Sequence, residues 1–246
     1  QNPRLFELIE QPYENLTEHL LSNRTSMSNS YVLLSKSKKA LIIDYGYDYI
    51  GGIAPGYDRA SRRPWLYTIE KLKKQYGIEK IDVAIPTHYH DDHVAGLNLL
   101  NNVEGTEIWS PANFADVLEH PKKYDLPCLW YDPIPVDRVL PLDATFTWEE
   151  YEFRLYPMSG HTYYAVAIEF EVDGKRVLAQ GDQYAGDGDE ANYVYRNGFR
   201  IHDYVDSAKL LQTVRPDLMI SGHWAPVEVT EDYLVEISEK GKELEQ

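Results

Sequence analysis

Short apolar runs alternate with segments of helical periodicity along the 246 residues of this chain. The apolar runs are bounded by turn residues and predict strands at residues 30–34, 40–43, 81–85, 107–110 and 218–221. Helical spacing of apolar residues predicts helices at residues 64–76, 94–100 and 204–214, and a last helix that Thr230 opens. Asp173-Gly174 predicts a hairpin turn between residues 165–172 and 176–179. The pattern by itself indicates a mixed α and β fold.

A cluster of metal-binding residue types follows the apolar run at residues 81–85 directly. The chain there has the sequence T-H-Y-H-D-D-H-V-A-G and places His88, His90, Asp92 and His93 within six residues. Imidazole nitrogen and carboxylate oxygen are ligands that zinc and similar ions prefer. Such a group is costly to bury without a cation. Four donors so close together cannot easily surround one ion, so we expect two ions and further ligands from distant segments.

Three distant residues have the setting that such ligands require. His161 in M-S-G-H-T and His223 in I-S-G-H-W each follow a Ser-Gly pair at the end of an apolar segment, and Asp182 in V-L-A-Q-G-D-Q repeats the pattern with a carboxylate. The predicted hairpin brings the strand after His161 beside the strand before Asp182. The remaining histidines have no such setting and are predicted to be structural: His19, His120 and His202.

The ordered set of motifs resembles the metallo-β-lactamase fold family of binuclear metallohydrolases. The resemblance rests on N-S-Y-V-L-L at residues 29–34, L-I-I-D-Y-G at 41–46, H-x-H-x-D-H, G-H-T, G-D and G-H-W, in the order in which the family carries them. It covers nearly the whole chain. It implies an α/β fold: a single domain over residues 1–246, built as a four-layer αββα sandwich of two mixed sheets flanked by helices.

The resemblance also implies the roles of the candidate residues. His88, His90 and His161 would hold a first metal ion, Asp92, His93 and His223 a second, with Asp182 bridging them, and Asp44 would be an anchoring acid near the site. The ions would be two divalent cations, zinc or else manganese or iron. A hydroxide that both ions bind would attack the substrate, since metal binding lowers the pKa of water from ~15.7 towards ~7. Asp92 would orient the nucleophile or carry a proton.

The substrate stays open at this point. Small esters, lactones, thioesters and phosphodiesters all fit, and a carboxylate bridge suits these better than a β-lactam amide, which is one alternative. Thr162-Tyr163-Tyr164 stands where the family often has Pro-Gly, and the residues given after His223 contain no obvious counterpart of the helical domain that binds glutathione. Both observations weaken a glutathione thioester assignment. The other alternative is an iron-dependent sulfur dioxygenase with one metal. The complete second ligand set favours two metals and hydrolysis.

Charge and cysteine content narrow the partners. The net charge of −16 argues against nucleic acid and anionic membranes as partners, because both need a basic surface. The family resemblance implies a small-molecule substrate. Cys128 is the only cysteine, so no disulfide forms within the chain, which is compatible with a cytoplasmic location. The chain begins at Gln1 and is consistent with an excised piece. Its oligomeric state cannot be predicted.

Several residues beside the predicted ligands are candidates for contact with substrate or for packing. Residues 47–63 and 184–200 are predicted long loops. The arginines of the second loop are suited to a substrate carboxylate or phosphate, or to ion pairs with the surplus acids of the chain. The individual candidates are Tyr163, Tyr164, Trp224, Tyr193, Tyr195, Arg196, Phe199 and Arg200.

Overall fold

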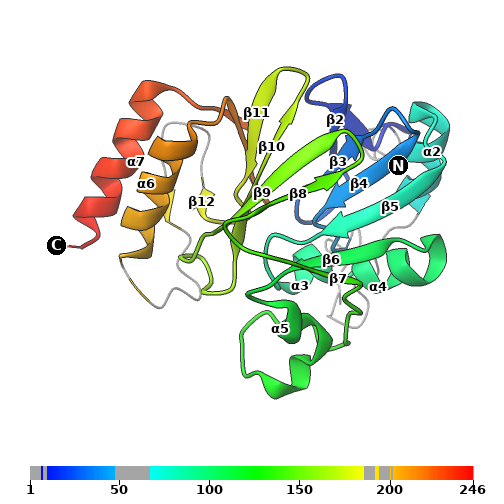
Figure 1. Cartoon of the computed structure of the whole chain (residues 1–246), viewed down its shortest axis with the longest axis horizontal. Coiled ribbons are helices and arrows are strands. Elements are labelled where there is room, and N and C mark those ends of the chain that lie inside the picture. The colour runs from blue at the N-terminus through cyan, green and yellow to red at the C-terminus, as the bar shows by residue number, and fades with distance from the viewer. Residues whose placement is uncertain are drawn as a thin grey trace. The chain divides into compact units, whose positions relative to one another are not determined.

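The computed structural model describes residues 7, 10–47, 67–185, 192–193, 200 and 202–245. These residues form two compact units (Figure 1). The first unit comprises Gln1–Ser110 and Ala115–Leu140, and the second comprises Pro111–Phe114 and Pro141–Gln246. The division at residue 140 falls at the end of the proline-containing stretch 127–141. Each unit is described separately below.

The first unit is built on a seven-stranded mixed sheet in the order β1 to β7. Its strands are β1 (Tyr13–Asn15), β2 (Leu20–Asn23), β3 (Ser30–Leu34), β4 (Lys39–Ile43), β5 (Lys80–Ile85), β6 (Glu107–Pro111) and β7 (Arg138–Leu140). The first four pair antiparallel, whereas β4, β5 and β6 run parallel. The middle strands are buried almost throughout, as their continuous apolar sequences predict.

Short helices accompany this sheet. They are α2 (Tyr67–Tyr76), α3 (Asp91–Val94), α4 (Leu97–Leu99), a π-helical turn η3 (Leu100–Glu104), α5 (Ala115–Glu119) and a 3₁₀ turn η4 (Pro121–Lys123). Helix α2 ends before Gly77, whose φ of +67° suits glycine, as predicted. The predicted start of this helix at Pro64 lies outside the described residues.

The helix predicted at residues 94–100 is confirmed only in part: residues 97–100 lie in α4 and η3, whereas residues 95 and 96 separate them from α3, which ends at Val94. Two tertiary hydrogen bonds replace the helical bond that would continue α3. The Gly96 amide donates to the Tyr45 carbonyl at 2.9 Å, and the Asp92 carbonyl accepts from the Ser28 hydroxyl. Helix propensity alone does not reveal such competitors.

The second unit is built on a six-stranded mixed sheet in the order β15-β14-β11-β10-β9-β8. The strands are β8 (Thr145–Trp148), β9 (Tyr151–Pro157), β10 (Val166–Val172), β11 (Lys175–Ala179), β14 (Leu218–Ile220) and β15 (Val227–Glu228), with a separate pair β12 (Tyr184–Ala185) and β13 (Asn192–Tyr193). The predicted hairpin at Asp173-Gly174 is confirmed, because β10 and β11 pair antiparallel and both turn residues have positive φ.

Two helices pack together on this second sheet (Figure 1). They are α6 (Asp203–Val214) and α7 (Glu231–Glu243), and both were predicted. Leu211 and Ile237 from the helices share one buried cluster with Leu178 and Met219 from the strands. Thr230 caps α7 by accepting a hydrogen bond from the Tyr233 amide. The two helices therefore pack against one face of the sheet.

Candidate metal centre

In the first unit, two parallel strands end at the predicted motif. Ile43 of β4 pairs with Ile85 of β5, so the residues that follow both strands lie at the same edge of the sheet. There the Asp44 carboxylate accepts hydrogen bonds from the Thr87 amide at 2.7 Å and the Thr87 hydroxyl at 2.8 Å. Asp44 is buried and has a φ of +59°. The predicted anchoring role of this acid is confirmed by these contacts.

Asp44 also holds one histidine of the motif. Its Oδ2 lies 2.9 Å from Nδ1 of His93, which is buried in α3. A carboxylate at Nδ1 favours the proton on that nitrogen, so that Nε2 carries the lone pair a metal needs. Nε2 lies 3.6 Å from Oδ2 of Asp92. Asp92 and His93 therefore direct ligand atoms toward each other.

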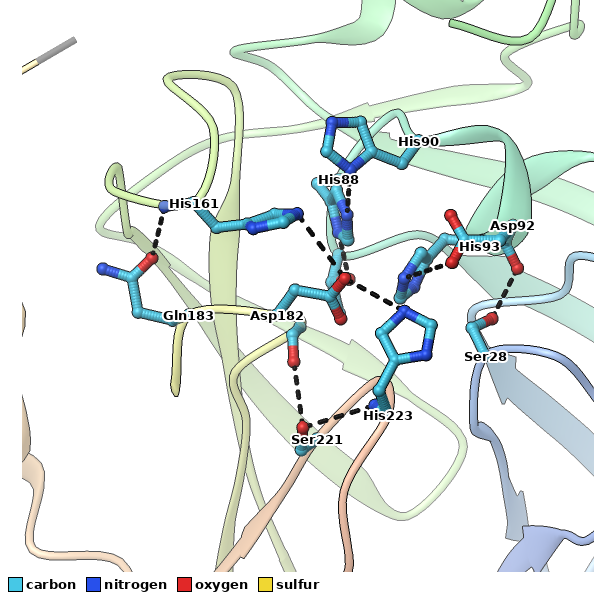
Figure 2. A network of polar contacts seen from close by, with 12 residues as sticks. Ser28, His88, His90, Asp92, His93, His161, Asp182, Gln183, Ser221 and His223 are labelled. Atoms are coloured by element: carbon cyan, nitrogen blue, oxygen red, sulfur yellow. Dashed lines mark hydrogen bonds and ion pairs between the residues drawn. The ribbon is translucent and has the colours of Figure 1, made fainter. Parts of the chain in front are cut away.

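The other two histidines of the motif form a second buried pair (Figure 2). Nε2 of His88 lies 3.1 Å from Nδ1 of His90, and the Thr87 hydroxyl lies 3.1 Å from Nδ1 of His88. His90 also forms a β-bridge with Leu129, and the Asp91 amide donates to the Cys128 carbonyl. The loop around Cys128 thus braces the motif from the outside. The thiol of Cys128 is exposed.

Glycine is required where the backbone of Asp92 passes the first strands. A Cβ at Gly46 would lie 1.6 Å from the Asp92 carbonyl oxygen, which also accepts from Ser28 (Figure 2). A Cβ at Gly96 would lie 2.2 Å from the Tyr45 ring. The motif therefore has little space in which to shift.

In the second unit, three strand ends supply the three distant residues. Strands β11 and β14 run parallel with Ala179 opposite Ile220, so Asp182 and His223, each three residues further on, reach the same edge. Strand β9 is antiparallel to β10, which is antiparallel to β11, so the segment that follows β9 and carries His161 starts at that edge as well. Oδ2 of Asp182 lies 3.5 Å from Nε2 of His161 and 3.2 Å from Nε2 of His223 (Figure 2).

Backbone and hydroxyl contacts fix these three segments to one another. The Gly222 amide donates to the Gly181 carbonyl at 2.9 Å, and the Ser221 hydroxyl also reaches that carbonyl. The His223 amide lies 3.4 Å from the Ser221 hydroxyl. The small Ser-Gly pair before each histidine thus allows two strand ends to meet closely.

The remaining candidates have mixed outcomes. Arg200 forms an ion pair with the buried Asp203 at 2.9 Å, as the ion-pair interpretation predicts, and lies 5.8 Å from the Tyr163 ring centroid. Tyr163 is exposed and packs edge-on against Tyr164, and Trp224 packs edge-on against His223. Most of the two predicted loops, with Tyr195, Arg196 and Phe199, and the side chain of Tyr193, lie outside the described residues.

Of the three histidines predicted to be structural, His120 and His202 lie apart from these ligand pairs in contacts of their own, whereas a ring nitrogen of His19 lies within 4.8 Å of a carboxylate oxygen of Glu18. His120 pairs with Asp116 at 2.8 Å, and His202 contacts Asp206 and Glu245. Sequence reasoning missed the supporting residues of the site: Ser28, Thr87, Gln183 and Ser221. Each except Ser28 lies within two residues of a predicted ligand, and Ser221 belongs to the Ser-Gly pair that precedes His223.

The donor set of each unit suits divalent cations. Ligand atoms of His88 and His90, of Asp92 and His93, of His161 and Asp182, and of Asp182 and His223 lie within 4.8 Å of each other. A carboxylate as buried as that of Asp182 is costly unless a positive charge compensates it, which a divalent cation held by the neighbouring imidazoles would supply. Imidazole and carboxylate without thiolate match a catalytic metal site better than a closed structural zinc site.

Comparison with known proteins identifies the family. The family model of the metallo-beta-lactamase superfamily matches residues 23–223. This chain therefore belongs to that superfamily, and its two mixed sheets with flanking helices are the fold of the family. A search of curated proteins finds no significant match.

Solved structures support the same fold at low sequence identity. A class B3 di-zinc metallo-beta-lactamase, LRA-12, from an Alaskan soil metagenome has a TM-score of 0.66 and 16% identity, covering 96% of this chain and 95% of its own. The DIM-1 metallo-beta-lactamase has a TM-score of 0.64 and 19% identity, with 94% and 96% covered. An archaeal superfamily protein from Sulfolobus tokodaii has a TM-score of 0.62 and 17% identity, with 91% and 86% covered.

Within the described ranges, none of the helices has both the length and the apolar character that crossing a bilayer requires.

Proposed function

We propose that this protein is a metal-dependent hydrolase that holds two divalent metal ions, most simply zinc. The observation that carries the proposal is the pairing of histidine and aspartate ligand atoms, all buried except those of Asp92 and His223, within each unit of a metallo-beta-lactamase superfamily chain. His88, His90 and His161 would hold the first ion, Asp92, His93 and His223 would hold the second, and Asp182 would bridge the two.

The bound ions would supply a water molecule of lowered pKa and would polarise the carbonyl or phosphoryl oxygen of the substrate. Asp44 keeps Nδ1 of His93 protonated and so directs Nε2 toward the ion. Asp92, whose carboxylate is partly exposed, is the proposed residue that accepts and returns the proton of the reaction. No nucleophile from the protein is required.

The proposed substrates are small esters, lactones, thioesters or phosphodiesters. A carboxylate bridge at Asp182 favours these over an amide. Hydrolysis of a β-lactam stays a second candidate, because several similar structures, such as LRA-12 and DIM-1, are of metallo-beta-lactamases. Oxygen chemistry with one iron ion is the alternative from another reaction class.

Metal content is the decisive measurement. Protein purified without added metal should contain about two equivalents of zinc, or of manganese or iron, by elemental analysis. His93→Ala should lower this toward one equivalent. His120→Ala is the matched control, because His120 lies in the same unit but pairs with the exposed Asp116, and it should keep both ions.

Protein with two ions should then be screened on lactones, thioesters, phosphodiesters and β-lactams. Hydrolysis that disappears with chelator and returns with metal supports the proposal. One equivalent of iron that His93→Ala does not change would contradict it and would favour the oxygen chemistry. Protein that binds no metal would contradict both.

A further inference from the structure

Gln183, the residue after Asp182, has a buried side chain whose amide group is fully used. Its Oε1 accepts a hydrogen bond from the His161 amide at 3.1 Å (Figure 2). Its Nε2 donates to the Ser159 carbonyl at 2.9 Å and to the Ser207 hydroxyl at 2.7 Å. A carboxamide has two N–H donors and one carbonyl, and each makes a bond here.

These three bonds connect three separate segments of the second unit. Ser159 and His161 belong to the loop after β9, Gln183 follows β11, and Ser207 lies in α6. The Ser207 hydroxyl in turn donates to the Asp203 carbonyl in the first turn of α6 at 2.8 Å. The backbone of His161 is therefore tied through one side chain to both the Asp182 segment and a packed helix.

The loop that carries His161 fits closely against this side chain. Gly160 has a φ of +152°, and a Cβ there would lie 2.3 Å from Nε2 of Gln183. Glycine is thus needed where the backbone passes the carboxamide. With so little clearance, the position of Gln183 determines where the loop lies, and with it the 3.5 Å separation between His161 and Asp182.

We propose that Gln183 is a positioning residue for metal binding: it sets the place of His161 relative to Asp182 and so tunes the affinity for the ion that His161 holds. This inference rests on the proposed function. Gln183 itself contacts neither metal nor substrate. A mere packing role would affect stability but not the affinity for the metal.

Gln180 offers a matched control. It is also a buried glutamine of the same turn, but among the described residues its side-chain amide bonds only to the backbone of Tyr184, through Oε1 and Nε2, each at 2.9 Å. Gln183→Leu and Gln180→Leu each replace a buried carboxamide with an apolar side chain of similar volume. Both should lower the melting temperature of the metal-free protein. Only Gln183→Leu removes contacts to the His161 loop.

The test measures zinc dissociation constants by competition with a chromophoric chelator, beside the melting temperature of metal-free protein. We expect Gln183→Leu to weaken the binding of one of the two zinc ions about 10–100-fold, which is the typical effect of removing a hydrogen-bond partner of a metal ligand. Gln180→Leu should leave both constants unchanged. Cobalt-substituted Gln183→Leu should also show an altered visible absorption spectrum.

Ser207→Ala keeps the test decisive if Gln183→Leu does not fold. It removes only the helix partner of the carboxamide, and we expect a smaller weakening at the same ion. Equal effects of Gln183→Leu and Gln180→Leu on metal affinity, or no effect of Gln183→Leu and Ser207→Ala, would overturn the positioning role while leaving the hydrolase proposal intact. Wild-type protein that binds no metal would overturn both.

Discussion

The two units present their candidate ligands in different ways. The first unit carries four in one segment of six residues, His88 to His93, braced by Asp44 and by close backbone contacts at Gly46. The second carries three at the ends of three strands, where Asp182 contacts both His161 and His223. One set depends on local sequence, whereas the other depends on strand pairing.

The difference teaches where each set is sensitive. In the first unit, a substitution within the motif directly affects the neighbouring ligands. The backbone around the motif has little space in which to adjust. In the second unit the ligand geometry follows from the register of β11 against β14 and from the side chains that tie the strand ends together. The following predictions test this comparison, from the largest expected effect to the smallest.

Asp182→Asn should have the largest effect, because this carboxylate contacts two of the proposed ligands and is the proposed bridge. We expect metal content to fall from two equivalents to one or none, and hydrolysis to fall by more than the ~10–100-fold typical of outer partners. Elemental analysis and substrate turnover measure this. Asp217→Asn is the control, since the Asp217 carboxylate accepts a hydrogen bond from the Arg176 amide and is not a proposed ligand, and it should change neither. Full metal content in Asp182→Asn would refute the bridge.

Asp44→Asn should have the next largest effect, in the first unit. The amide loses the charge that holds the Nδ1 proton of His93, and we expect about 10–100-fold weaker binding of one ion. Chelator competition measures this. Asp137→Asn, which alters a carboxylate that accepts from the Ile108 amide in the same unit, should leave binding unchanged. Identical metal affinity in both variants would show that Asp44 serves the fold alone.

Gly46→Ala should act on stability rather than chemistry. The added Cβ would overlap the Asp92 carbonyl, and we expect a loss of about 3 kcal/mol or more in the free energy of unfolding of the metal-free protein. Gly105→Ala is the control, because it also lies in the first unit and has nothing within 4 Å of the added Cβ, so only its φ of +67° opposes the change. It should cost about 1–2 kcal/mol. Equal losses of unfolding free energy in Gly46→Ala and Gly105→Ala would mean that the backbone of the motif can shift to accommodate the added Cβ.

Tyr156→Phe should have the smallest effect, on the strand β9 that leads toward His161. Burial, and then the hydrogen bond to Glu169, raise the pKa of Tyr156 from 10.0 to about 12. The unfolded chain therefore loses this proton first as the pH rises. The contribution of Tyr156 to stability is complete below about pH 10 and is lost as the pH rises toward 12. Denaturant unfolding between pH 9 and about 11.5 should show a shallower decline for Tyr156→Phe than for the wild type. Parallel curves would contradict this.

The sequence predicted the regular elements well where they are continuous and apolar. The strands around residues 30–34, 40–43 and 81–85 and the hairpin at Asp173-Gly174 were all predicted within one or two residues. Such runs and turns depend on local properties, namely side-chain burial and backbone φ. The helix predicted at residues 94–100 is interrupted after Val94, because Tyr45 and Ser28, distant in sequence, take over the hydrogen bond that would continue α3 into α4.

By itself, the sequence determined the residue types, the order of the motifs and the strand ends that carry the candidate ligands. It determined them because the ligand chemistry of histidine and aspartate and the alternation of apolar runs are local. Only the tertiary structure decided which side chains hold those ligands. Asp44 meets His93, and Gln183 meets both His161 and Ser207, because parallel strands and a packed helix bring them together. Hydrogen bonds between residues so far apart in the sequence leave no periodic pattern in it, so they become visible only in the folded structure.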